Sequence, residues 1–150
     1  GISMFLSELL SYATRHEQAN GALYLFIQDS IEWLDHAKGA IANFHIVFMI
    51  QLSFHLGFMP NIESGMSGDY FDLVDGCFAA HVPSHVHYLN KEDSMRLVSL
   101  FRLDYKTMHL YTMSRIERNR CVEVILEYYK LHLPDFPEMK SFSVLQELFA

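Results

Sequence analysis

A run of apolar residues at positions 41–58 most constrains what this chain can fold into, because it leaves almost no polar face. Read as a helix over 41–56, it carries Ile, Phe, Val, Met and Leu side chains around most of its circumference. A helix of this kind is packed by other elements on most of its sides. The polar residues Asn43, His45, Gln51 and His55 interrupt the run, and each is costly in hydrocarbon. We therefore expect a buried core helix rather than a membrane span.

Amphipathic patterns predict further helices on both sides of this core segment. Apolar residues recur at helical spacing over 2–17 and again over 23–39, which predicts a helical hairpin. Later in the chain, Asn90 is a suitable N-cap with Asp93 three positions on, and Ser114 and Glu117 have capping-box spacing. Two helices are therefore expected to begin there, while the segment between them, 104–113, is ambiguous.

The stretch 127–141 joins a long helix to a short last one through an elbow bracketed by prolines, with the sequence EYYKLHLPDFPEMKS. Pro134 and Pro137 cannot lie inside a helix. The helix is therefore expected to end near His132, and Ser141 is expected to cap a final helix.

Residues 61–90 have a different character. Gly65, Gly68, Gly76 and Pro83 break the segment, and alternation at 70–74 and 77–80 predicts two short strands. With 150 residues, 51% of them hydrophobic, the chain is long enough for one core. We predict a single all-α domain over 1–150, a helical bundle of five or six helices with a small irregular β-hairpin insertion at about 61–90.

Charge and cysteine content narrow the functional classes. The net charge of −7 gives no positive footprint for nucleic acid, so tight DNA binding by these residues is not expected. Cys77 and Cys121 are 44 positions apart, and no secretory segment is recognisable, which fits a reducing cytoplasm.

Motifs of catalytic chemistry are missing from the sequence. No G-x-S-x-G turn, no phosphate-binding glycine loop and no Glu-x-x-His pair of a di-metal site occurs in it. We expect no enzyme and no cofactor.

One cluster has residue types that bind metals. Cys77, His81, His85 and His87 follow a C-x3-H-x3-H-x-H spacing, which could surround zinc in a folded loop. The favoured interpretation is a solvated loop of neutral histidines, because the loop does not obviously supply the second shell that a metal site needs. A zinc site, or a metal-dependent enzyme built on it, is the alternative.

Four segments, in order, resemble the C-terminal helical domain of the RecO family of bacterial recombination mediators. The first three are FLSELLSYATRHEQAN, ANFHIVFMIQLSFHLGFMPNI and FDLVDGCF. The fourth is the tyrosine-rich helix that leads through a proline to Lys-Ser and a short helix. Together they cover most of the chain.

The chain departs from the family pattern at two places. Many relatives bind a structural zinc with two CxxC-like pairs, whereas here the first pair is missing from 61–68 and Ala80 stands where the partner of Cys77 would be. A four-thiolate site is excluded by count, and the insertion is a degenerate zinc-finger region. Some relatives also show arginines at the start of the central helix, where this chain has Ala42 and Asn43.

The resemblance implies a non-catalytic mediator of recombinational DNA repair in the DNA damage response. It implies contacts with the acidic C-terminal tail of single-strand-binding protein and with a RecR-type partner. DNA would be bound mainly by an N-terminal OB-fold, whose strands and basic loops are missing from these residues. For the tail we expect an apolar groove with Phe44 and Phe48 in its walls and Arg115 and Arg118 receiving carboxylates.

Two simpler alternatives remain. The densest group of basic residues can form an ordinary solvated helix face; it consists of Arg115, Arg118, Arg120, Lys130 and Lys140. Aromatic-rich helices can also enclose a small molecule, so a helical ligand-binding or dimerisation domain of a regulatory protein is the competing function.

Overall fold

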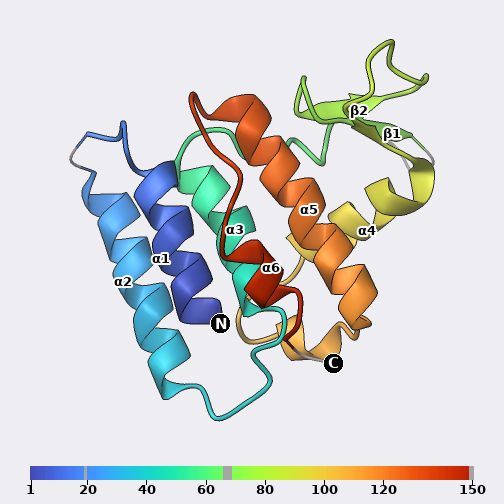
Figure 1. Cartoon of the computed structure of the whole chain (residues 1–150). Helices are drawn as coiled ribbons and strands as arrows, with labels where there is room; N and C mark the ends of the chain where they lie inside the picture. The colour runs from blue at the N-terminus through green and yellow to red at the C-terminus, as the bar shows by residue number, and fades with distance from the viewer. Residues whose placement is uncertain (19, 66–68, 149–150) are drawn as a thin grey trace.

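The computed structural model describes residues 1–18, 20–65 and 69–148. In these residues the chain forms a helical bundle with a small β-sheet at one end (Figure 1). The helices are α1 (Ile2–Ala13), α2 (Gly21–His36), α3 (Phe44–His55), α4 (Lys91–Phe101), α5 (Arg115–His132) and α6 (Phe142–Leu145), with a 3-10 turn, η1 (Met108–Leu110). The strands are β1 (Tyr70–Asp72), β2 (Cys77–Ala79) and β3 (Tyr88–Leu89).

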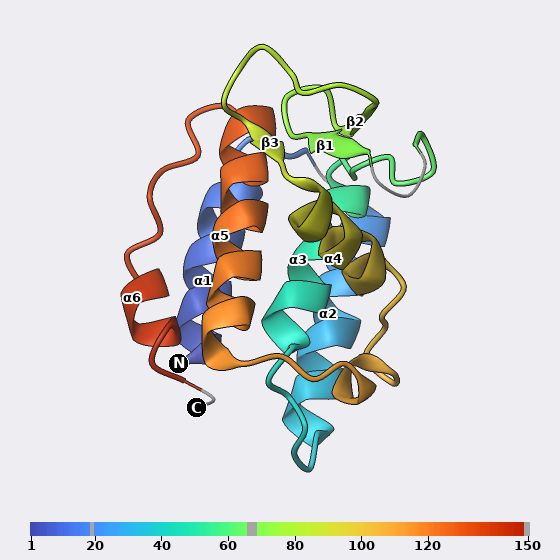
Figure 2. The ribbon, with the colours of Figure 1, turned by 90° about the vertical axis from the view of Figure 1, so that its right-hand side faces the viewer.

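α3 is the central element, as its sequence predicts. Nine of its twelve residues are buried, and α1, α2, α4 and α5 surround it in the two views (Figures 1 and 2). Burial and the positive charge of Arg118 lower the pKa of His45 to about 3, so this histidine is neutral at pH 7. No helix in the described part of the chain is long and apolar enough to cross a membrane.

The helix starts follow the predicted caps. The Asn90 side chain accepts a hydrogen bond from the Asp93 N–H at 2.7 Å, and Ser114 and Glu117 form a reciprocal capping box. α5 ends at His132, before the two prolines, as predicted. The first two helices end earlier than their apolar patterns do, at Ala13 and His36.

Ser141 has a different role from the predicted one. It stands at the N-cap position of α6 but makes no side-chain capping bond. Its hydroxyl and its N–H instead donate to Glu8 Oε1 at 2.7 and 2.8 Å, and the Lys140 N–H donates to Glu8 Oε2 at 3.0 Å. The carboxylate of α1 therefore anchors the last helix across the surface of the bundle.

The insertion is a three-stranded antiparallel sheet with the order β2-β1-β3. Phe71 pairs with Phe78 on one side and with Leu89 on the other. The predicted hairpin is therefore present, and the chain adds a third, two-residue strand just before α4. The all-α fold class with a small β insertion is confirmed.

Candidate functional site

The two phenylalanines expected in a groove wall lie in the core. Phe44 and Phe48 are fully buried. Phe44 stacks against Trp33 and Tyr105 at centroid distances of 5.8 and 4.8 Å, and those two rings also stack on each other at 5.1 Å. Phe48 stacks on Phe26 at 5.3 Å. These rings hold α2 and the loop after α4 against α3, and a peptide would have to displace that stack to reach them.

The two arginines lie in different surroundings. Arg118 is 7% exposed; its Nη2 donates to the Met113 carbonyl at 3.1 Å and its Nε to Asn43 Oδ1 at 3.4 Å. Burial lowers the pKa of Arg118, yet a guanidinium titrates so high that it stays charged at neutral pH. Arg115 is more exposed and lies 3.8 Å from Glu147 Oε2.

Arg118 lines a hollow that the sequence did not indicate, which we call the Arg118 pocket. It has a volume of about 170 Å³. Asn43 shapes it, because its amide nitrogen donates to the carbonyls of Met108 and Tyr111 at 3.1 and 2.8 Å and ties the η1 loop to the start of α3. The lining residues are neutral or basic: Ala40, Ala42, Asn43, Met108, His109, Tyr111, Thr112, Met113 and Arg118.

The Arg118 pocket lies at the N-terminal ends of α3 and α5, at the opposite end of the bundle from the sheet (Figure 2). Helix N-termini carry a partial positive charge, which adds to that of the guanidinium. Leu110, between the lining residues His109 and Tyr111, is 73% exposed. The arrangement suits a ligand that combines a carboxylate with an apolar side chain.

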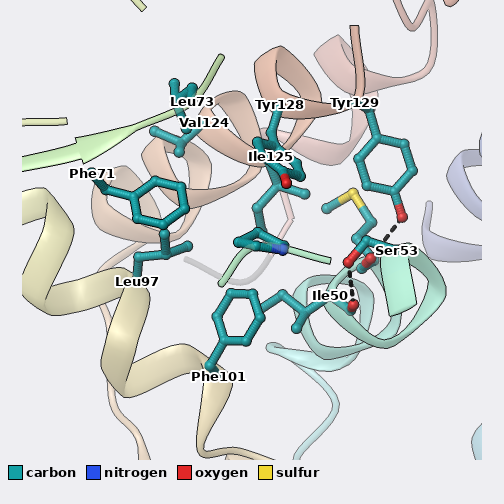
Figure 3. Close-up of a pocket in the computed structure, with 12 residues that line it drawn as sticks. Ile50, Ser53, Phe71, Leu73, Leu97, Phe101, Val124, Ile125, Tyr128 and Tyr129 are labelled. Atoms are coloured by element: carbon teal, nitrogen blue, oxygen red, sulfur yellow. Dashed lines mark hydrogen bonds between the residues drawn. The ribbon is translucent and has the colours of Figure 1, made fainter. Parts of the chain in front are cut away.

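A second hollow lies beneath the insertion, where Phe71 and Leu73 meet Leu97 and Phe101 of α4 and Val124 of α5 (Figure 3). We call it the insertion seam. Its walls are almost wholly apolar, and its volume is about 20 Å³, room for roughly one water molecule. The seam is therefore a packing contact that holds the sheet on the helices, and not a ligand site.

Aromatic side chains pack over the insertion. Phe71 is fully buried and meets Phe78 edge-on at 5.1 Å, and Tyr70 meets Tyr88 edge-on at 6.0 Å. The sheet is thus tied to the bundle by a small core of its own.

The histidine loop uses its side chains for hydrogen bonds. His85 Nδ1 accepts from the His87 N–H at 3.0 Å, so its Nε2 carries the proton and donates to Asp72 Oδ2 at 3.1 Å. His87 Nδ1 lies 2.8 Å from Glu127 Oε1 and links the loop to α5.

The described residues contain no group of three or more His, Cys, Asp or Glu side chains placed to hold a metal ion. The weak candidates Cys77, His81, His85 and His87 are therefore not gathered around one point.

Burial raises the pKa of Asp72, but hydrogen bonds from the Asp75 N–H, His85 and the Val74 N–H outweigh burial and lower it overall. Asp72 is therefore a carboxylate at neutral pH, and it holds the turn after β1 as well as the histidine loop.

Sequence reasoning singled out Arg118 but did not predict that Asn43 and the 108–113 loop lie beside it. The loop has no periodicity, so only its ambiguity was visible. An asparagine just before an apolar helix is a usual N-cap signal. Here its side chain bonds to the loop instead of to α3.

The family model for "Recombination protein O C terminal" matches residues 1–141. The chain is 47% identical over 149 residues to the DNA repair protein RecO of Phocaeicola vulgatus and 48% to that of Bacteroides fragilis, covering 99% of this chain and 62% of each relative. It is 30% identical over 150 residues to the DNA repair protein RecO of Flavobacterium psychrophilum, covering 99% of this chain and 61% of that relative. The chain thus spans less than two thirds of these relatives, and no solved structure matches it significantly.

Proposed function

The chain belongs to the RecO C-terminal family, and from that premise we propose that it is the partner-binding part of a non-catalytic mediator of recombinational DNA repair in the cytoplasm. The relatives that it matches are named DNA repair proteins. Its net charge of −7 supports a role in docking proteins, since DNA binding needs a clustered positive field. DNA would be bound mainly by an OB-fold elsewhere in the protein, and a RecR-type protein would be a further partner.

The Arg118 pocket is the proposed site for the acidic C-terminal tail of single-strand-binding protein. One observation carries this assignment: a buried guanidinium lines a hollow of about 170 Å³ whose other lining residues are neutral or basic. The tail's terminal carboxylate would face Arg118, and its aromatic end would enter the hollow beside Met108 and Met113.

The exposed neighbours of the pocket have supporting roles in this proposal. Leu110 would contact an apolar tail residue outside the hollow. Arg115 would exchange its weak, exposed pairing with Glu147 for an acidic residue of the tail. This interpretation keeps both predicted arginines and replaces Phe44 and Phe48, which are buried.

The test is a titration of fluorescently labelled tail peptide, followed by anisotropy. We expect saturable binding that weakens with salt, since exposed charges are screened over about 10 Å at 0.1 M. The variant Ala42→Phe fills the hollow while Arg118 itself is kept, and it should weaken binding at least about tenfold, or about 1.4 kcal/mol.

The matched control is Ala80→Phe, which adds the same ring on an exposed residue of the insertion. It should bind like the parent chain, and both variants should melt cooperatively. No binding at high micromolar protein, or equal binding by the two variants, would refute the site.

The competing function, enclosure of a small molecule, receives no support from the seam. Its volume of about 20 Å³ is far below the roughly 300–1,000 Å³ of ordinary ligand pockets.

A further inference from the structure

α2 lies at the outer edge of the bundle and leaves much of its surface uncovered (Figure 1). Of its sixteen residues, Leu23 and Ser30 alone are buried. Tyr24, Leu25 and Ile31 are 52%, 57% and 43% exposed. Single exposed apolar residues are ordinary on protein surfaces, but three large ones on one side of one helix form a patch.

The same side of α2 is acidic. Asp29, Glu32 and Asp35 are exposed, and helical spacing places them among the apolar residues of the patch. The helix contains no Lys or Arg, and none of the ion pairs found among the described residues uses these carboxylates. We call the six residues Tyr24, Leu25, Asp29, Ile31, Glu32 and Asp35 the α2 face.

One of these charges is unfavourable for the helix itself. Asp35 lies in the last turn of α2, at the negative end of the helix dipole, with Glu32 and Asp29 about one and two turns before it. None of the ion pairs found among the described residues offsets the charge of Asp35.

The negative charge of the α2 face determines which kinds of partner can bind it. A second copy of the chain would bring two sets of three carboxylates face to face, and nucleic acid or an acidic peptide would meet the same repulsion. A protein surface with lysines or arginines around an apolar groove complements both properties of the face.

We infer that the α2 face docks a partner protein through a basic, apolar groove. This surface is separate from the Arg118 pocket and opposite to it in charge. The two sites therefore select partners of opposite sign, and each can be tested while the other is intact.

The experiment uses the 150-residue chain and a synthetic amphipathic helical peptide of leucine and lysine as the probe. Amide shifts in NMR spectra should concentrate at residues 21–36 and saturate. The same peptide with glutamate in place of lysine should not bind. Shifts spread over the whole surface, or the absence of saturable binding, would overturn the inference.

A matched pair of variants separates docking from general charge attraction. Asp29→Asn/Glu32→Gln/Asp35→Asn should weaken probe binding at least about tenfold, or about 1.4 kcal/mol. A control variant with three exposed acidic residues neutralised elsewhere should change the affinity for the probe by less than about twofold, well below the tenfold change expected for the α2 face. The control substitutions are Glu63→Gln, Asp75→Asn and Asp135→Asn.

Both triples carry the same three neutralisations, which change the net charge from −7 to −4 (−7 + 3). Equal weakening by the two triples would refute the α2 face. The α2 triple should leave Tm unchanged or raise it slightly, because Asp35 is the one carboxylate of the three in the last turn of the helix. Lost binding with an unchanged or raised Tm cannot be a folding defect.

The apolar half of the face has its own control. Tyr24→Ser/Leu25→Ser should weaken probe binding in high salt, where charge attraction is screened. Val82→Ser/Val86→Ser, at exposed valines of the insertion, should leave binding unchanged. If instead the parent chain dimerises in sedimentation and Tyr24→Ser/Leu25→Ser abolishes the dimer, the occupant is a second copy and the inference is wrong.

Discussion

The substitution Phe71→Ala should reveal whether the insertion belongs to the cooperative core. Phe71 is fully buried, packs edge-on against Phe78 and points into the insertion seam (Figure 3). Truncating a buried phenylalanine to alanine costs about 3–5 kcal/mol, depending on how far the site collapses. Because its neighbours Leu97 and Val124 come from two separate helices, the site cannot close easily, and we take about 4 kcal/mol.

For a chain of this length each kcal/mol shifts Tm by roughly 2–4 °C, so Phe71→Ala should lower Tm by about 8–16 °C. The assay is a thermal melt by circular dichroism, with Val82→Ala as the control at an exposed position of the insertion, expected to change stability by less than about 0.5 kcal/mol. Hydrogen exchange provides a second measurement. If Tm falls by less than about 3 °C while amide protection is lost only in residues 69–89, the insertion unfolds by itself and the reasoning is refuted.

Three further predictions concern the ends of helices. Glu8→Ala removes the carboxylate that accepts three hydrogen bonds from Lys140 and Ser141, and it should lower the free energy of unfolding by about 1–2 kcal/mol. Residues 134–148 should then be cut faster by protease, and an unchanged rate of cleavage would contradict the role of Glu8 in holding the last helix. Ser114→Ala should break the capping box and cost about 1 kcal/mol in urea unfolding, and a neutral result would show that the box is redundant. Hydrogen bonds from the Ser114 N–H and then from Arg96 lower the pKa of Glu117 from 4.5 to about 2, so its contribution is complete above pH 4.5 and is lost as the pH falls toward 2. Glu117→Gln should therefore flatten the fall in stability between pH 5 and pH 2, and an identical acid profile for the variant would rule this contribution out.

Local signals were enough to predict most of the helical architecture. Caps such as Asn90 and Ser114 depend on residues three positions away, and the prolines after His132 end α5 whatever lies around it. The apolar circumference of α3 likewise fixed its central place. These features need no knowledge of distant contacts.

Other features depend on contacts that sequence patterns do not encode. A helix that is apolar all round does not reveal which of its rings face the core, so Phe44 and Phe48 were assigned to a surface. The partner of Ser141 lies 133 positions upstream, and β3 has only two residues, too few for a periodic pattern. The role of Asn43 was hidden because its bonds reach 65 and 68 positions along the chain.

Two adjacent tyrosines on α5 form hydrogen bonds to the central helix and to the loop that follows it. The Tyr129 hydroxyl donates to the Met49 carbonyl within α3, and the Tyr128 hydroxyl donates to the Phe58 carbonyl just beyond α3. Consecutive side chains on a helix point about 100° apart, so α5 cannot roll about its axis or slide along α3 without breaking both bonds. The rotation and the register of α5 on α3 are therefore fixed along a helix about 27 Å long, which reaches from the Arg118 pocket to the sheet.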